Sequence, residues 1–169
     1  MKWYYKLNHI TQLFHYFLLQ ALNVYEEIIS SVVYENSGFF FLYGYCGTIK
    51  TFMWRTLSVA VRCIGKIVLN VASSGIAYLL LPGGKTTHYR FCISIIINEE
   101  STCIIPQGSH HARLLIETKL IIWDEAPMMN QMCFEAFDRT LRDVMRTVNE
   151  GNSKKPFNGK IVVLGGDFR

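Results

Sequence analysis

The sequence lacks the patterns that mark zinc-binding, secreted and membrane-spanning proteins. Its five cysteines form no C-x-x-C pair and no Cys/His spacing suggests zinc, so we expect reduced thiols in an intracellular protein. His110-His111 could suggest a metal, but neighbours on a helix point in different directions, which favours a solvated pair. No secretory signal opens the chain, and no uncharged apolar run reaches the roughly 20 residues of a bilayer span. We expect a soluble protein without a membrane partner.

Charge is also scarce, and this excludes a disordered chain. Only 18% of the 169 residues are charged whereas 50% are hydrophobic, which is a globular composition. The length predicts one domain with a sizeable core. The net charge of +4 permits a polyanion as partner but does not require one.

Apolar runs of strand length alternate with segments of helical periodicity. The expected strands are 39–43, 67–72, 120–123 and 161–164, and the expected helices are 14–33, 50–64, 76–81, 111–118 and 130–148. We also expect a short strand around Cys92–Ile97 and a solvated loop over 151–159. Because Phe39–Tyr43 is wholly apolar, it is expected to be buried on both faces of a parallel sheet. This alternation predicts an α/β fold with a parallel sheet flanked by helices.

The segment Gly44–Thr51 is a phosphate-binding loop with one glycine missing. The pattern G-x-x-x-x-G-K-[ST] requires glycine at position 49, where this chain has isoleucine. In such loops backbone N–H groups and a helix N-terminus hold phosphate, while Lys50 would reach the β- and γ-phosphates and the Thr51 hydroxyl would ligate Mg²⁺. The alternative is an ordinary strand–turn–helix junction. The other candidate nucleotide-binding residues of the loop are Gly44, Gly47 and Thr48.

Two acidic residues follow the expected strand 120–123. Four apolar residues before Asp124-Glu125 are typical of a Walker B strand, in which Asp124 would hold Mg²⁺ and Glu125 would polarise the attacking water. The alternative is a buried strand that ends in two solvated acids. Because another strand separates this pair from Lys50, the spacing favours the catalytic interpretation.

Two further polar turns also follow expected strands. Gly165-Gly166-Asp167 ends the fourth strand, where Asp167 could sense the γ-phosphate or couple it to a partner domain. Ser73-Ser74-Gly75 ends the second strand, where hydroxyls and a helix N-terminus could contact a nucleic-acid phosphate. A plain helix cap is the alternative at that turn. Ligands of open α/β sheets bind at the carboxyl ends of the strands, which is where all these groups fall.

Several blocks of the sequence together resemble the Pif-one (petite integration frequency) DNA helicases of superfamily one, especially the branch found in Helitron-type transposons. The likeness runs from about Val24 to Arg169, and the blocks follow the order and spacing of that family. The blocks are Phe40–Gly44, Leu69–Ala77, Leu80–Gly84, Trp123–Met128, Asp138–Asp143 and Gly165–Arg169.

The resemblance implies a RecA-like P-loop NTPase domain in an ATP-driven, Mg²⁺-dependent enzyme. Such enzymes move along single-stranded DNA, in the 5′-to-3′ direction, and part duplexes in DNA repair, recombination and telomere maintenance, so a nuclear location is expected. Lys50 and Glu125 match catalytic residues of the family, and Thr51 and Asp124 match its magnesium residues. The residues that match or neighbour its DNA-contacting segments are Ser73, Ser74, Gly75, His88, Arg90 and Phe91, the last three through base stacking and phosphate contact.

The loop departs from the family pattern in ways that bear on activity. Ile49 and Cys46 replace glycines, and the glutamine that reads adenine in the family falls on Ala21, one residue from Gln20. Glycine lets the backbone approach phosphate in torsions that a β-branched residue resists. A forced conformation costs about 1–3 kcal/mol, or roughly a five- to hundredfold loss of affinity. We therefore expect weak or absent ATP binding.

The family continues beyond Arg169 with a second motor domain that carries an arginine finger. The resemblance thus predicts a motor domain over residues 38–169 that is truncated at its C-terminal end and preceded by a helical segment over 1–37. Because an arginine finger contributes about 10³–10⁵ in rate in GTPases, we expect the isolated chain not to unwind DNA. Two alternatives stay open, a non-catalytic module that binds single-stranded DNA and a decayed transposon fragment. The sequence predicts no oligomeric state.

Overall fold

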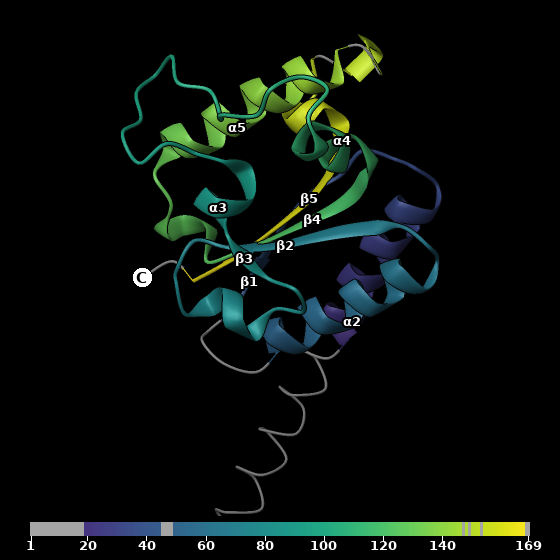
Figure 1. Cartoon of the computed structure of the whole chain (residues 1–169). Coiled ribbons are helices and arrows are strands. Elements are labelled where there is room, and N and C mark those ends of the chain that lie inside the picture. The colour runs from purple at the N-terminus through teal and green to yellow at the C-terminus, as the bar shows by residue number, and fades with distance from the viewer. Residues whose placement is uncertain (1–18, 45–48, 147, 149, 153, 168–169) are drawn as a thin grey trace, which may run out of the picture.

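The computed structural model of the chain describes residues 19–44, 49–146, 148, 150–152 and 154–167. They form a parallel sheet between two layers of helices, which Figure 1 shows edge-on. The strands are β1 (Phe39–Tyr43), β2 (Ile67–Ala72), β3 (Lys85–Thr86), β4 (Thr118–Asp124) and β5 (Ile161–Gly166). The α-helices are residues 19–33, α2 (Ile49–Cys63), α3 (Thr87–Phe91), α4 (His110–Glu117) and α5 (Gln131–Met145). The 3₁₀ helices are η1 (Ala77–Leu80), η2 (Ala126–Met128), η3 (Glu150–Asn152) and η4 (Pro156–Gly159).

The sheet has the strand order β1-β5-β4-β2-β3, and each neighbouring pair is parallel. Parallel neighbours need a crossover, and helices supply it here on both faces of the sheet. The strand β5 lies between β1 and β4, although it comes last in the chain. The alternation of apolar runs and amphipathic segments therefore predicted the fold class correctly.

Each face of the sheet has its own hydrophobic core. On one face Trp54 and Leu57 of α2 pack with Ile28 of the helix over residues 19–33. On the other face Phe91 of α3 packs with Phe137 of α5. Figure 1 shows the same division, with α2 on one side of the sheet and α4 and α5 on the other. The central strands β2, β4 and β5 are covered on both faces and are therefore almost wholly buried.

Polar residues and one glycine fix where the helices begin and end. At the start of α5 the Asn130 carboxamide oxygen accepts a hydrogen bond from the amide of Met132. The Ser109 hydroxyl caps α4 in the same way. Gly65 follows α2 with φ of +72°, a conformation that glycine adopts without strain. The expected helices within the described residues are therefore confirmed to within a few residues; positions 14–18 of the first one lie outside the described residues.

The expectation that Phe39–Tyr43 is buried on both faces is wrong. In β1 exposure alternates along the strand, and Phe39, Phe41 and Tyr43 are all exposed. The reason is its position at the edge of the sheet, where it pairs with β5 alone among the described residues. An apolar run does not reveal whether a strand is central or at an edge, because helices cover both faces only in the middle of the sheet.

The strand expected around Cys92–Ile97 is absent. The short helix α3 lies directly before this segment. The Thr86 hydroxyl caps its start, and Cys92 ends it in left-handed torsions (φ 51°, ψ 40°). The apolar residues that follow do not pack together, since Ile95 and Ile96 are 92% and 89% exposed. The two-residue strand β3 completes the sheet instead. The expectation of a solvated loop over 151–159 is partly wrong. The segment overlaps η3 and contains η4, and Phe157 and Asn158 in it are buried.

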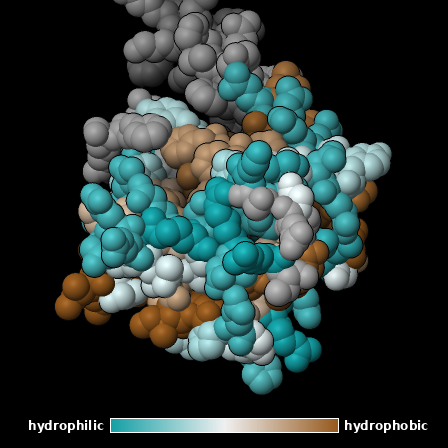
Figure 2. Space-filling model, turned by 90° about the horizontal axis from the view of Figure 1, so that it is seen from above, coloured by the Kyte–Doolittle hydropathy of each residue, from teal (hydrophilic) through white to brown (hydrophobic). Residues whose placement is uncertain are grey.

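The face of the molecule that carries α5 is largely hydrophilic. Figure 2 views this face and shows hydrophobic side chains gathered in separate patches rather than in one continuous area. Such scattered patches are ordinary on a protein surface. Within the described part of the chain, every helix is too short or too polar to cross a bilayer.

Candidate functional site

The candidate site lies where the strands of the sheet end. The register pairs Tyr43 with Gly166 and Ala72 with Asp124, so four strands finish at a common edge. In Figure 1 this edge lies on the side of the molecule marked by the label C. The residues at or directly beyond these strand ends include Gly44 and the polar residues Ser73, Asp124, Glu125 and Asp167. Topology therefore brings the sequence motifs together at the edge where α/β sheets bind ligands.

Lys50 and Asp124 face the same site. Burial raises the pKa of the Asp124 carboxyl above its ordinary value, and the Glu125 amide, the Trp54 indole and the Lys50 ammonium each partly offset this rise. A Cβ atom on Gly44 would lie 3.6 Å from Lys50 Cγ, and one on Gly165 would lie 2.8 Å from Asp124 Oδ1. Both side chains therefore lie at the ends of the neighbouring strands β1 and β5. The lysine at the start of α2 and the carboxylate at the end of β4 thus converge, although they are far apart in the sequence.

The Asp124 carboxylate lies in a crowded, nearly buried position. The residue is 8% exposed, and Oδ1 accepts a hydrogen bond of 3.0 Å from the Glu125 amide. A Cβ atom on Gly165 would lie 2.8 Å from Asp124 Oδ1 and 2.4 Å from Trp54 Cζ2. The Trp54 indole nitrogen lies close by without a hydrogen bond of standard geometry, so it stabilises the carboxylate only weakly. Position 165 must therefore be glycine, because the Trp54 ring and the Asp124 carboxylate approach its backbone closely.

Glu125 begins the turn after β4 in left-handed torsions, with φ of 53° and ψ of 36°. Its carbonyl oxygen accepts from the amide of Met128, which holds the turn. The side-chain atom Oε2 is buried and has no hydrogen-bond partner among the described residues. A buried carboxylate oxygen without a partner is costly, so this atom is suited to a water molecule or a hydrated cation. The non-glycine αL conformation is itself typical of functional sites.

Ile49 is the first residue of α2, so the helix begins directly before Lys50. The first N–H groups of a helix have no partner within it, and such an N-terminus is suited to hold phosphate. The expected effect of isoleucine at position 49 on ATP binding stays a prediction.

The remaining loop residues are only partly within the described residues. Thr51 is half-buried in the first turn of α2, beside Lys50 in the sequence. The Gly44 amide donates to the Gly166 carbonyl at 3.4 Å, which ties the start of the loop to the end of β5. The predictions for Gly47 and Thr48 concern positions outside the described residues.

Ser73 is held by β4 through two hydrogen bonds, and sequence reasoning missed one of its partners. Its amide donates to the Asp124 carbonyl at 3.1 Å, and its hydroxyl accepts from the Trp123 indole Nε1–H at 3.1 Å. A tryptophan inside a buried strand needs an acceptor for its N–H, and that was the signal in the sequence. The strand that carries the acid pair is therefore bonded directly to the Ser73 turn.

The next two residues of that turn have different surroundings. The Ser74 hydroxyl accepts from the Ala77 amide at 3.2 Å, a local bond of the turn before η1, whose N-cap residue Ile76 makes no side-chain cap. That bond uses an acceptor position of the oxygen and leaves the O–H available as a donor. Gly75 is exposed, and a Cβ atom there would meet nothing within 4 Å. The turn is thus accessible to a ligand.

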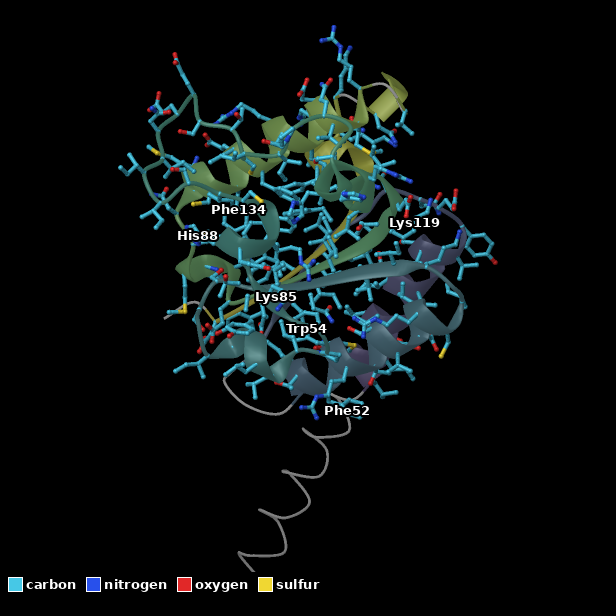
Figure 3. All side chains as sticks on the ribbon, in the orientation of Figure 1. Phe52, Trp54, Lys85, His88, Lys119 and Phe134 are labelled. Atoms are coloured by element: carbon cyan, nitrogen blue, oxygen red, sulfur yellow. The ribbon has the colours of Figure 1, made fainter. Side chains whose placement is uncertain are left out.

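The segment around α3 needs one correction. Phe91 is fully buried and stacks on Phe137 with ring centroids 3.9 Å apart, so it is a core residue and cannot stack on a base. The exposed aromatic residue of this segment is Tyr89, 67% exposed, with the Lys85 ammonium 5.4 Å from its ring centroid. His88 is half-buried, as is Arg90. In Figure 3 His88 and Lys119 lie on opposite sides of the molecule, and Lys85 lies between them.

The residues at this edge fit a magnesium–nucleotide complex. Mg²⁺ in such sites is held by one or two carboxylates together with phosphate oxygens rather than by a full set of protein ligands. Asp124 supplies a buried carboxylate, and Glu125 supplies the oxygen without a partner. Among the described residues no group of three or more His, Cys, Asp or Glu is placed to hold a metal. A metal here would therefore depend on phosphate oxygens for the rest of its coordination.

Comparison with known families gives a match over most of the chain. The family described as PIF1-like helicase matches residues 20–169. The chain is 29% identical over 153 residues to the ATP-dependent DNA helicase PIF1 of Trypanosoma brucei brucei, covering 90% of this chain and 14% of that protein. It is also 29% identical over 132 residues to the ATP-dependent DNA helicase PIF4 of the same organism, covering 76% of this chain and 16% of that protein.

Solved structures agree with this match. The chain resembles the crystal structure of Bacteroides Pif1 bound to ssDNA, with a TM-score of 0.63 and 30% identity over 84% of this chain and 31% of that one. It resembles Pif1 from Bacteroides in complex with ADP-AlF3 and ssDNA, with a TM-score of 0.66 and 27% identity over 85% of this chain and 31% of that one. The chain thus spans about a third of these structures and about a seventh of the two trypanosomal proteins.

Proposed function

Because the chain belongs to the PIF1-like helicase family, we propose that it forms the nucleotide-binding part of an ATP-dependent DNA helicase. The observation that carries this proposal is the convergence of the Lys50 ammonium and the Asp124 carboxylate at the carboxyl edge of the sheet. A cation from the loop and a buried acid from β4 are the pair that a triphosphate with its metal needs.

Each residue of the edge has a part in this proposal. Mg²⁺, when bound, neutralises phosphate charge. Lys50 binds the β- and γ-phosphates, and the Thr51 hydroxyl and the Asp124 carboxylate hold the metal. Glu125 acts as the general base, because its oxygen without a partner is positioned to accept a proton from water. Gly44, Gly47 and Thr48 contact the phosphates of the nucleotide, and Asp167 contacts the γ-phosphate.

The DNA strand is proposed to lie beside β2 and α3. Ser73, Ser74 and Gly75 form an accessible turn whose hydroxyls can donate to phosphate oxygens. His88 and Arg90 lie in the following helix and supply phosphate contact. Tyr89 takes over the stacking position expected of Phe91, because it is the exposed ring and it lies next to Lys85. The relatives bound to ssDNA support a strand as ligand.

The wider roles are proposals about a longer protein, because the chain spans only a part of its relatives. We infer a division into a helical segment over 1–37 and a motor domain over 38–169. Movement in the 5′-to-3′ direction and the roles in repair, recombination and telomere maintenance rest on the family resemblance alone. The same holds for an intracellular, nuclear location and for the Helitron-like branch.

A second candidate function is binding of single-stranded DNA without turnover. Two features favour it: the isoleucine at position 49, and the exposed Tyr89 beside Lys85. This function is favoured over a helicase if the affinity for an oligonucleotide is the same with and without ATP and falls as the salt concentration rises.

Titration of Mg²⁺-ATP into the chain and into Ile49→Gly tests the proposed function. Glycine removes the branched side chain, so we expect ATP to bind Ile49→Gly about five- to hundredfold more tightly. In the same background Lys50→Met and Asp124→Asn should each abolish the magnesium-dependent part of binding. Glycine in a helix also costs about 1 kcal/mol, so Ile49→Gly should be slightly less stable. If Mg²⁺-ATP binds tightly and neither Lys50→Met nor Asp124→Asn weakens this binding, the proposal is contradicted.

A further inference from the structure

Trp123 links the strand that ends in the acid pair to the turn that is proposed to meet DNA. Its indole Nε1–H donates to the Ser73 hydroxyl at 3.1 Å, across 50 residues of sequence. The next residue along β4 is Asp124, whose carbonyl accepts from the Ser73 amide. The Ser73 main chain and side chain are thus both bonded to β4.

The Trp123 ring is held rigidly. It is fully buried, and the Phe134 ring stacks on it with centroids 4.3 Å apart. Phe91 and Phe137 contact it at centroid distances of 5.6 and 6.0 Å. In Figure 3 Phe134 lies on the side of the molecule where Figure 1 labels α3. Because close-packed aromatic rings leave the indole one orientation, the direction of its N–H is fixed.

The chemistry of this bond decides what the Ser73 hydroxyl can do. An indole N–H can only donate, so the serine oxygen must be the acceptor. A hydroxyl has one donor and two acceptor positions, and the bond from Trp123 occupies one of the acceptors. Among the described residues the hydrogen bonds include no acceptor for the Ser73 O–H. The hydroxyl proton is therefore available to an external acceptor, and Ser73 is only half-buried.

We propose that Trp123 is a positioning residue that holds the Ser73 hydroxyl so that its O–H donates to a backbone phosphate oxygen of single-stranded DNA. This inference rests on the proposed function. It assigns Trp123 a part in strand binding although its side chain is buried and touches no ligand. It also makes β4 the element that connects the acid pair with the strand, since Trp123 and Asp124 are adjacent in it.

A double-mutant cycle on oligonucleotide affinity tests the inference. The full chain and the variants Ser73→Ala, Trp123→Phe and the double variant are titrated into fluorescent oligothymidine at fixed salt. Each single change should weaken binding about fivefold, which is the effect of one neutral hydrogen bond. The double variant should also lose about fivefold, because Trp123 acts through Ser73. If the double variant instead loses about 25-fold in affinity, the product of the two single losses, Trp123 acts only through packing and the proposal is overturned.

Phe134→Leu is the matched control. It removes one of the three rings around Trp123 and keeps the indole N–H, which Phe91 and Phe137 still orient. It should therefore lower stability and weaken oligothymidine binding by much less than Trp123→Phe does. An affinity loss in Phe134→Leu equal to that in Trp123→Phe overturns the proposal. If the unaltered chain binds no oligothymidine, the DNA-binding part of the proposed function fails and this inference fails with it.

A second measurement does not depend on the folding of Trp123→Phe. In the chain labelled with ¹⁵N-tryptophan, the indole N–H signal of Trp123 reports its hydrogen bond. We expect this signal to move in Ser73→Ala, and to move on addition of oligothymidine in the unaltered chain but not in Ser73→Ala. An indole signal that saturating oligothymidine leaves in place overturns the proposal.

Discussion

The Asp124 carboxylate lies against the backbone of Gly165, so closely that a Cβ atom at position 165 would stand 2.8 Å from Asp124 Oδ1. Only glycine at position 165 leaves room for the Asp124 carboxylate in this place. We predict that Gly165→Ala destabilises the fold by about 1–3 kcal/mol, because Trp54 and Asp124 must both move. Thermal unfolding measures this loss.

Gly75→Ala is the control for stability, since a Cβ atom on Gly75 meets nothing within 4 Å and its φ is not positive. Its melting temperature should stay close to that of the unaltered chain. Equal melting temperatures for Gly165→Ala and the unaltered chain would mean that position 165 has room and that Asp124 is not confined.

Asp124 should make the fold less stable above the pH at which it ionises. Burial raises the pKa of this carboxyl in the folded chain above 3.8, so the folded state holds the proton more tightly than the unfolded state does. Stability is therefore lost as pH rises from the unfolded pKa through the folded one. We predict that Asp124→Asn melts at a higher temperature than the unaltered chain at pH 7.

The gap in melting temperature between Asp124→Asn and the unaltered chain should shrink as the pH falls through the folded pKa toward the unfolded value of 3.8, because the folded chain takes up the proton first. A scan of melting temperature from pH 4 to 8 measures it. A lower melting temperature for Asp124→Asn at pH 7 would show that the ionised carboxylate stabilises the fold, against this account.

Lys160 should have the opposite pH dependence, at the far edge of the sheet. Burial, with a smaller contribution from Lys119, lowers the pKa of Lys160 to about 8 from 10.5. The unfolded chain then holds more protons between these values, so stability should rise as pH increases from about 8 to 10.5. Lys160→Met should remove this rise.

Lys160→Met should also lower stability by about 1–3 kcal/mol at pH 7, because it leaves the carbonyls of Ile116 and Thr118 without their donor. Lys154→Met, at an exposed position, is the control and should change neither stability nor its pH dependence. Denaturant unfolding at pH 7, 8 and 10 separates the two effects. Identical curves for Lys160→Met and Lys154→Met would contradict both.

Tyr89 and Phe91 should respond to alanine substitution in opposite ways. Phe91→Ala should cost about 3–5 kcal/mol of stability, because the ring is fully buried. Tyr89→Ala should change stability by less than about 0.5 kcal/mol but weaken binding of single-stranded DNA by about 1–3 kcal/mol. Unfolding and oligonucleotide titration of both variants test the reassignment. A stable Phe91→Ala with impaired DNA binding would restore the original assignment.

The sequence predicted the order of the main elements because their signals are local. Buried strands such as Leu120–Trp123 read as unbroken apolar runs, and α5 has a clear amphipathic period. The polar residues after each strand could be assigned to one edge because parallel strands end together. The convergence of Lys50 and Asp124 follows from that rule.

What the sequence did not reveal depends on distant partners. Whether Phe91 faces solvent or the core depends on Phe137 in α5, which no pattern near Phe91 records. The bond from Trp123 to Ser73 joins β4 to the turn after β2, and these two strands are neighbours only because of the sheet order. Exposure of β1 likewise depends on its position at the edge of the sheet.

The central claim is that a metal-bound nucleotide sits at the carboxyl edge of the sheet, between Lys50 and Asp124. The most direct test is paramagnetic broadening of amide NMR signals by Mn²⁺-ATP in Ile49→Gly, where Mn²⁺ replaces Mg²⁺. We predict selective loss of the signals of Gly44, Glu125 and Gly165, while those of Lys119 and Ile161 at the opposite edge persist. Broadening centred on Lys119 and Ile161, or spread evenly over the chain, would contradict the account.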